Sequence, residues 1–437
     1  MLVFEAKLEG SNQQYEKLDE AIRTARFIRN SCIRYWMDNT GIGKYELSAY
    51  CAVLAKQFSW ANQLNSMARQ ASAERAWSAI ARFYDNVRRS SELRQAQLPR
   101  SRRSLSAHVE ACKKGKQGRR GFPRFKKHQT HGSVEYKTTG YKLSEDRRSI
   151  TFTDGFKAGS FKLWGTRDLH FYQLSQIKRV RVVRRADGYY AQFCLDVERI
   201  EKREPTGKTI GLDVGLTHFY TDSNGQTVEN PRHLRKSEKA LKRLGRRLSR
   251  THKGSKNRAD IRNRLSRKHL KVSRQRKDFA VKLARCVVQS NDLVAYEDLQ
   301  VRNMVKNKRL SKSISDAAWS ALRDWLEYFG KVFGVVTVAV PPHYTSLNCS
   351  NCGKVVNKSL SQRTHRCSDC GFVLDRDWNA AINILELALR TVCPTGTSVR
   401  LRSPSVVEVN ASGDIDLCLG EQTPLSKPSR GKRKPKE

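Results

Sequence analysis

The sequence of 437 residues predicts a multidomain α+β protein, because the residue pattern changes twice along the chain. The first part repeats apolar residues at helical spacing, and the second consists of short alternating runs typical of an antiparallel sheet. After Pro205, apolar strands alternate with helices, which indicates an α/β layer. A chain of this length can hold two or three such domains.

The net charge and the cysteine content indicate which class of protein this chain belongs to. The chain has 84 Lys+Arg and 42 Asp+Glu, a formal net charge of +42, and 11 cysteines. A polyanion such as nucleic acid neutralises such a charge and releases counterions. No run is apolar enough to span a membrane and the N-terminus lacks the pattern of a secretory signal, so we expect a cytoplasmic protein without a membrane partner. The odd number of mostly scattered cysteines does not indicate a disulfide framework.

The first part, residues 13–119, is expected to form a helical domain that ends in a basic linker. Apolar residues recur at helical spacing between residues 15 and 89. Most aromatic residues in helices are core residues, although stacking on bases is an alternative for four of them. These are Trp36, Trp60, Trp77 and Tyr84.

Residues 1–12 and 120–204 are expected to form a small antiparallel β-barrel. Alternating runs occupy residues 149–153, 160–164 and 189–195, and Asp187-Gly188 lies where a hairpin would turn. A strand near residue 3 would complete the barrel. Such barrels often bind nucleic acid, but their shape alone does not establish this.

Residues 205–390 are expected to form the α/β domain. Apolar strands are predicted at residues 208–213, 292–297 and 335–340, with helices at 316–333 and from Asp377 onward. The polar and basic tail, residues 391–437, is expected to be disordered.

A basic helical hairpin is predicted at residues 232–285. Between Arg232 and Lys277 about twenty Lys and Arg face only two acids, and residues 253–257 interrupt the helical pattern. Like charges at i,i+4 destabilise a bare helix, which favours a phosphate-facing surface over a solvated helix pair. The candidate nucleic-acid contacts are Arg246, Arg247, Arg250, Lys253, Arg264, Arg267 and Lys268.

Two C-x-x-C pairs predict a structural zinc site. Cys349/Cys352 and Cys367/Cys370 are separated by 14 residues, and glycine follows the second cysteine of each pair. Each turn presents two thiolates, and two turns complete a tetrahedron around one Zn²⁺. Residues 344–374 would form this zinc ribbon inside the α/β domain. Buried or redox cysteines are the alternative.

Three separated acids form the second candidate site. Asp213 and Glu297 each end a predicted strand, and Asp377 begins a predicted helix. Each has an ordinary interpretation, as a strand-end acid or a helix N-cap. Together they form the pattern of a phosphodiester hydrolase in which carboxylates hold two Mg²⁺ ions.

Several motifs in this order resemble the TnpB (OrfB) proteins of bacterial insertion sequences, which are relatives of the type V CRISPR effectors. The motifs cover residues 206–390, and the first half fits in length and architecture only. They are Gly211-Leu-Asp-Val-Gly-Leu, Tyr296-Glu-Asp-Leu-Gln-Val, Lys312-Ser-Ile-Ser-Asp-Ala, Tyr344-Thr-Ser-Leu-Asn-Cys-Ser-Asn-Cys-Gly and Cys367-Ser-Asp-Cys-Gly-Phe-Val-Leu-Asp-Arg-Asp-Trp-Asn. Leu347 departs from the glutamine that many members carry.

The resemblance implies an RNA-guided DNA endonuclease of a transposable element, which cleaves double-stranded DNA beside a short flanking motif. The guide would be an RNA from the transposon end, paired with the target DNA. A recognition domain and a wedge-like barrel would precede a RuvC-like nuclease domain of RNase H fold. Its catalytic residues would be Asp213, Glu297 and Asp377, with Asp375 secondary.

Two alternatives stay open. The protein could be a compact type V CRISPR effector that uses a crRNA, or a guided DNA-binding regulator that does not cut. In either case we expect a monomer associated with the nucleoid of a bacterium.

Overall fold

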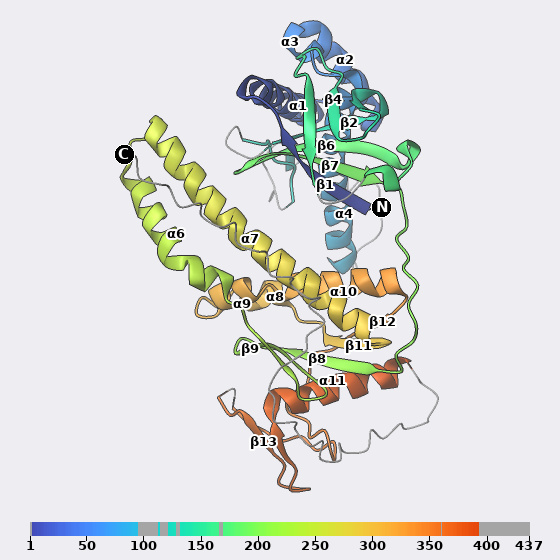
Figure 1. The fold of residues 1–437 in the computed structure, drawn as a ribbon, viewed down its shortest axis with the longest axis vertical. Coiled ribbons are helices and arrows are strands. Elements are labelled where there is room, and N and C mark those ends of the chain that lie inside the picture. The colour runs from blue at the N-terminus through green and yellow to red at the C-terminus, as the bar shows by residue number, and fades with distance from the viewer. Residues whose placement is uncertain are drawn as a thin grey trace, which may run out of the picture. The chain divides into compact units, whose positions relative to one another are not determined.

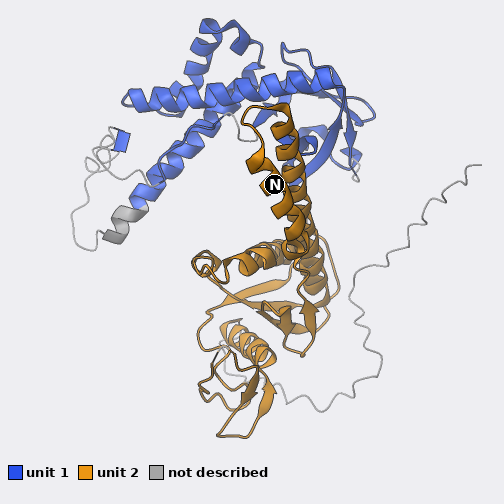
Figure 2. Ribbon diagram, turned by 90° about the vertical axis from the view of Figure 1, so that its left-hand side faces the viewer, with its two compact units in different colours: residues 1–198 blue, residues 199–437 orange. Residues whose placement is uncertain are grey.

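The computed structural model describes residues 2–94, 112–113, 121–127, 132–165, 169–359 and 361–392. The chain forms two compact units, residues 1–198 and 199–437 (Figure 2). Most of the expected basic linker and nearly all of the expected tail lie outside the described residues. In the part of the chain that the structure describes, no helix is both long and apolar enough to cross a lipid bilayer.

The helices of the first unit share one apolar core with its sheet. They are α1 (Asn12–Asp38), α2 (Lys44–Gln57), α3 (Ser59–Asn62) and α4 (Ser66–Arg94), with short 3₁₀ turns further on at 138–140, 169–171 and 174–176 (Figure 1). The side chain of Ser11 accepts a hydrogen bond from the backbone N–H of Gln14 and so caps α1. Trp36 is fully buried, as expected, but Trp60 is 42% exposed.

The same unit contains a seven-stranded antiparallel sheet in the order β2-β6-β7-β1-β5-β4-β3. Its strands are β1 (Leu2–Glu9), β2 (Ser133–Lys137), β3 (Tyr141–Leu143), β4 (Ser149–Phe152), β5 (Ser160–Trp164), β6 (Ile177–Arg185) and β7 (Gly188–Leu195). The first strand lies between β5 and β7, which confirms that a strand near residue 3 joins the sheet.

The expected closed barrel is corrected to an open half-barrel. Among the described residues, the edge strands β2 and β3 are not paired with each other. Helix α4 packs against β2 instead, so a helix covers that edge. An open sheet that is shielded in this way needs no closure to protect its edge.

The second unit contains a five-stranded sheet in the order β10-β9-β8-β11-β12. Its strands are β8 (Thr209–Val214), β9 (His218–Asp222), β10 (Thr227–Glu229), β11 (Leu293–Glu297) and β12 (Val336–Val340). Strands β8, β11 and β12 run parallel to one another. Strand β9 pairs antiparallel with β8, and β10 pairs antiparallel with β9. The three apolar strands predicted from the sequence are therefore confirmed and lie side by side.

Helices cover both faces of this sheet (Figure 1). Helix α11 (Arg376–Val392) packs against one face, where Ile384 and Leu385 contact Leu293 and Ala295. Helices α7 (Lys256–Ser290) and α10 (Trp319–Phe333) pack against the other face, which carries Leu212 and Val294. Because side chains alternate along a strand, the odd-numbered residues of β11 face α11.

The basic hairpin forms as predicted from α6 (His233–Arg250) and α7, with a break at residues 251–255 (Figure 1). One guanidinium nitrogen, Nη1 of Arg258, donates to the carbonyl oxygen of Leu248 at 2.5 Å and to that of Thr251 at 2.7 Å. The carbonyl oxygen of Leu248 also accepts from the N–H and the hydroxyl of Thr251, and the bonds from Arg258 join the start of α7 to the end of α6.

The helix predicted at residues 316–333 is wrong at its start. The structure has α8 (Val301–Met304), then α9 (Ser311–Ala317), and α10 begins only at Trp319. Ala318 adopts a left-handed conformation with φ of 60° between α9 and α10. The carboxylate of Asp316 there accepts the backbone N–H groups of Leu234 and Arg235 and is paired with Arg276.

Candidate metal centre and carboxylate site

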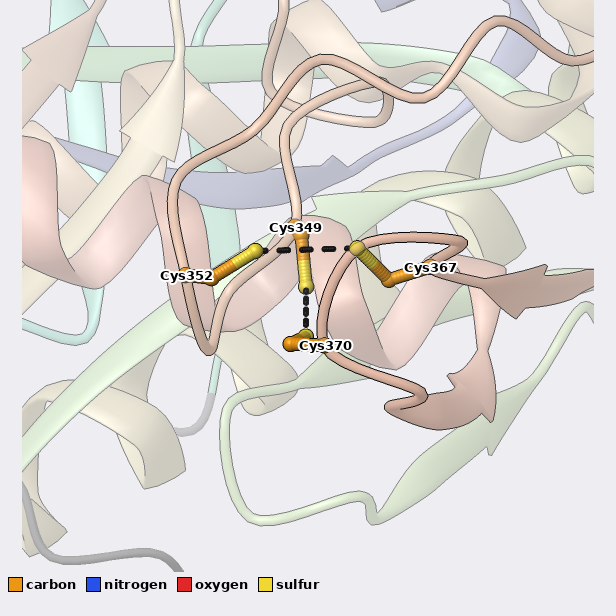
Figure 3. A group of neighbouring side chains, drawn as sticks. All are labelled: Cys349, Cys352, Cys367 and Cys370. Carbon is orange, nitrogen blue, oxygen red and sulfur yellow. Dashed lines mark hydrogen bonds between the residues drawn. The ribbon is translucent and has the colours of Figure 1, made fainter.

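The four predicted zinc ligands converge. The sulfur atoms of Cys349, Cys352, Cys367 and Cys370 all lie within 4.8 Å of one another. Figure 3 shows Cys349 facing Cys370, with Sγ atoms 3.7 Å apart, and Cys352 facing Cys367, with Sγ atoms 3.6 Å apart. Four thiolates at about 2.3 Å from one Zn²⁺ would be roughly 3.8 Å apart. The sulfur positions therefore fit a closed tetrahedral zinc site.

Local backbone geometry explains this convergence. In each turn the N–H of the glycine, Gly353 or Gly371, donates to the carbonyl oxygen of the first cysteine, at 2.8 Å and 3.1 Å. Both glycines have positive φ, 76° and 71°, a region that glycine enters without steric cost. The hairpin of β13 (Thr364–Arg366) and β14 (Val373–Asp375) supports the second turn.

Two asparagines of α11 bind the first cysteine turn to that helix. Asn379 accepts from the N–H of Ser350 at 3.0 Å and donates to the carbonyl oxygen of Asn348 at 2.8 Å. Asn383, one turn later, donates to the carbonyl oxygens of Thr345 and Asn348 at 2.7 and 2.8 Å. The signal for this contact in the sequence is a pair of polar residues four apart on an otherwise apolar helix, and neither residue was among the predicted site residues.

Strand register places two of the three predicted acids side by side. Leu212 is paired with Tyr296 in the parallel ladder, so Asp213 and Glu297 follow on neighbouring strands. Both extend the odd-numbered face of their strands, which is the face that α11 covers.

A glycine lets α11 bring the third acid to the same face. A Cβ atom at Gly211 would lie only 2.3 Å from the carbonyl oxygen of Ala381, so only glycine allows this close contact. Asp213 follows Gly211 by two residues, and Asp377 precedes Ala381 by one helical turn. The three acids therefore come from two strands and one helix that meet at this point.

The electrostatic surroundings of Asp213 include both other acids. Burial raises the pKa of Asp213 well above its usual range, and the carboxylates of Glu297 and Asp377 raise it further. Burial also raises the pKa of Glu297, while a hydrogen bond from the hydroxyl of Thr345 opposes that effect. A cation bound here would remove the repulsion that disfavours the ionised form of Asp213.

The acids are less tightly gathered than the cysteines. Within the described ranges, the cysteine cluster is the only group of three or more potential ligands whose ligand atoms lie this close together.

The acids near the start of α11 have hydrogen-bond partners of their own. Arg363 donates to the carboxylate of Asp377 at 3.2 Å and to the hydroxyl of Thr217 at 3.3 Å. Asp375 instead accepts the N–H groups of Asp377 and Trp378, at 2.8 and 3.1 Å, and so acts as the N-cap of α11.

The candidate nucleic-acid contacts lie on α6, α7 and the turn that joins them. All are exposed except Lys268, which is half-buried. Within the described part of the chain, no carboxylate lies within ion-pair distance of Arg246, Arg247 or Arg250. Their charges are therefore available to an external anion.

Two family models match the part of the chain that carries these sites. A family model described as "OrfB_IS605: Probable transposase" matches residues 192–308, and one described as "Cas12f1-like, TNB domain" matches residues 319–384. The chain of "Cryo-EM structure of the Cas12f1-sgRNA-target DNA complex" is 16% identical with a TM-score of 0.52. The match covers 86% of this chain and 83% of that one. At this identity the match shows a shared fold alone.

Two curated relatives are bacterial. A "Putative RNA-guided DNA endonuclease" of Streptomyces pristinaespiralis is 39% identical over 212 residues, which are 48% of this chain and 52% of that protein. "Putative RNA-guided DNA endonuclease InsQ" of Escherichia coli K12 is 30% identical over 283 residues, 61% of this chain and 68% of that protein. The matches thus span about half and about two thirds of these relatives. The chain belongs to the TnpB (OrfB) family.

Proposed function

We propose that this protein is an RNA-guided DNA endonuclease of an insertion sequence, which cleaves double-stranded DNA beside a short flanking motif. The observation that carries the proposal is the placement of the adjacent strand ends of Asp213 and Glu297 on the sheet face that α11, the helix of Asp377, covers. Membership of a family whose bacterial relatives bear the name RNA-guided DNA endonuclease supports it.

The topology supports a nuclease domain of RNase H fold, RuvC-like, within residues 205–390. Three antiparallel strands continue into two parallel ones, and α11 crosses the face that carries the acids. Within residues 1–198, we propose residues 1–12 and 120–204 as the wedge-like domain and residues 13–119 as the recognition domain. Residues 391–437 would form a basic tail.

The three acids would hold divalent metal, which we propose to be two Mg²⁺ ions. When bound, such ions activate a water and stabilise the leaving oxygen of the phosphodiester. The charge of such ions would offset the repulsion that the carboxylates of Glu297 and Asp377 exert on Asp213. Thr345 would orient Glu297 through its hydroxyl hydrogen bond.

The cysteine cluster would bind one structural Zn²⁺ and take no part in the chemistry. Four sulfur ligands fill the coordination shell, so no position stays open for water or substrate. The link through Asn379 and Asn383 would let the zinc site fix the segment that carries Thr345.

The basic hairpin would contact nucleic-acid phosphates through Arg246, Arg247, Arg250, Lys253, Arg264, Arg267 and Lys268. The partners would be a guide RNA from the transposon end and the target DNA, in a bacterial cytoplasm at the nucleoid, with a monomeric protein. Pairing would then read the sequence while the protein contacts backbones and the flank.

Two other functions remain as outcomes of the test: a compact type V CRISPR effector, and a guided regulator that binds without cutting. The protein is purified with its co-expressed RNA, the RNA is sequenced, and plasmid libraries are offered in Mg²⁺. RNA that maps to a transposon end, with cutting that Asp213→Ala abolishes, supports the proposal. RNA from a repeat array indicates the effector. Tight binding without cutting indicates the regulator.

A further inference from the structure

A hollow in the first unit is lined by basic side chains from three separate segments. Arg29 comes from α1, Arg75 from α4, and Lys126 from residues 121–127. The hollow has a volume of about 240 Å³ including its open mouth. The remaining lining residues are Ala25, Arg26, Ser72, Gly132 and Ser133.

Neutral groups hold the guanidinium groups of Arg29 and Arg75 and the backbone of Lys126. Arg75 donates to the carbonyl oxygen and the hydroxyl of Ser133 at 3.1 and 2.9 Å. Arg29 donates to the carbonyl oxygen of Arg124 at 3.2 Å. The side chain of Asn30 accepts from the N–H of Lys126 at 2.9 Å and donates to its carbonyl oxygen at 3.0 Å. The site is therefore built from fixed side chains and a fixed backbone segment.

These cations have no carboxylate partner in the part of the chain that the structure describes. None of Arg29, Arg75 and Lys126 forms an ion pair there. Glu135 is the carboxylate that favours the charge of Arg75, but it is already paired with Arg179 and Arg181. An external anion would neutralise these charges.

The proton affinity of Lys126 reflects the same imbalance. Burial, followed by the charges of Arg75 and Arg29, lowers the pKa of Lys126 to about 8. Burial and neighbouring arginines lower the pKa of Arg29 as well. Half-buried like charges are costly without a counter-ion, whereas an ordinary solvated basic surface would not show this effect.

We propose that the hollow lined by Arg29, Arg75 and Lys126 binds one phosphodiester group of a nucleic-acid backbone. The guanidinium groups of Arg29 and Arg75 would donate to the phosphate oxygens, because Arg matches the geometry of phosphate. The assignment of the phosphate to a nucleic acid rests on the proposed function, whereas the anion site itself does not. RNA and DNA strands offer the same phosphodiester chemistry.

The first experiment uses the full-length protein stripped of nucleic acid. Thermal unfolding is followed while sodium phosphate replaces sodium chloride at constant ionic strength. We expect phosphate to raise the melting temperature of the wild type by about 2–4 °C, because a ligand of the native state stabilises it. Lys126→Gln and Arg75→Gln should lose this shift. Arg148→Gln, which removes an exposed charge in the same unit, should keep it.

Lys126→Gln keeps the test independent of folding. The Lys126 side chain makes no hydrogen bond in the described structure, and its substitution relieves repulsion, so the variant should melt no lower than the wild type without phosphate. An equal phosphate response in the wild type and Lys126→Gln would overturn the proposal, even if guided cleavage were intact.

The second experiment identifies the source of the phosphodiester. Fluorescence anisotropy measures binding of matched RNA and DNA single strands to the wild type, Lys126→Gln and Arg148→Gln. A loss of about tenfold for RNA alone assigns the site to RNA, and the same loss for DNA alone assigns it to DNA. Unchanged affinity for both strands, despite a lost phosphate response, would contradict a nucleic-acid ligand. If Lys126→Gln loses strand binding as expected but the wild type does not cleave DNA, only the proposed function would be contradicted.

Discussion

The cysteine cluster and the carboxylate site both attach to α11, yet they are organised in opposite ways. The four sulfurs already stand at the spacing of a closed tetrahedron, whereas the three acids are spread over β8, β11 and α11 and repel one another. A structural metal fills its site, but a catalytic metal needs positions for water and substrate. The contrast fits the proposal that the first site would hold the second in place and that only the second would do chemistry.

Asp213→Ala should give the largest loss of cleavage activity, and it tests most directly whether the carboxylate site alone does the chemistry. Metal coordination supplies several kcal/mol of transition-state stabilisation, so cleavage should fall by about 10³-fold or more. Target binding should be retained, because the carboxylate repels phosphate. Plasmid cleavage and gel-shift assays on the guide complex measure both. Asp278→Ala, an exposed acid of α7, serves as the control, and a comparable loss there would contradict the assignment.

Cys367→Ser should affect folding more than chemistry. A structural zinc contributes on the order of 10 kcal/mol to ordering its segment, so the variant should bind no zinc and lose a low-temperature unfolding step. Elemental analysis and calorimetry measure these changes. Cys286→Ser, a cysteine of α7 outside the cluster, should keep one zinc per chain. Full zinc content in Cys367→Ser would remove this cysteine from the ligand set.

Charge reversal of Arg246 and Arg247 should leave both metal sites unchanged and weaken nucleic-acid binding. Each lost phosphate contact should lower the salt dependence by about 0.7–0.9 in the slope of log K against log [salt]. Titrations at several salt concentrations test this. Lys331→Glu, an exposed cation on α10, is the control. A slope equal to that of the wild type would return the hairpin to the interpretation of a solvated helix pair.

Asp213→Asn should raise the stability of the protein without added Mg²⁺. Because the pKa of Asp213 is raised in the folded state, that state binds its proton more tightly than the unfolded chain does. Wild-type stability is thus lost as the pH rises from the ordinary aspartate pKa of about 3.9 towards the raised value, and the variant escapes this loss.

At neutral pH the Asp213→Asn variant should therefore melt about 2–4 °C above the wild type for each kcal/mol of relieved repulsion. Added Mg²⁺ should stabilise the wild type and not the variant. Calorimetry of zinc-loaded protein at pH 5 and pH 7.5 measures the difference, with Asp278→Asn as the control. A variant that melts lower than the wild type at both pH values would contradict the repulsion inferred for this site.

The sequence predicted those parts of the molecule that local pattern determines. The strands that carry Asp213 and Glu297, the hairpin break near residue 253 and the convergence of the four cysteines all follow from apolar runs, glycines and spacing. A single strand-end acid carries no specific signal, so the prediction of a joint site came from the three acids taken together, and the family resemblance added their expected roles.

Tertiary contacts determined what the sequence did not predict. The break at Ala318 depends on Asp316, which binds the start of α6 and Arg276 from another helix. The open edge of the first sheet depends on α4, which packs against β2. Asn383 and Lys126 likewise gain their roles from partners 35 or more residues away, and no local pattern encodes those partners.

Anomalous diffraction from crystals soaked in Mn²⁺, a substitute for Mg²⁺, would locate the divalent ions directly. We predict manganese bound to the carboxylate of Asp213 and shared with Glu297 and Asp377, apart from zinc on the four cysteines. Manganese that binds elsewhere, or a saturating soak that leaves Asp213 without an ion, would contradict a catalytic site built from these three acids.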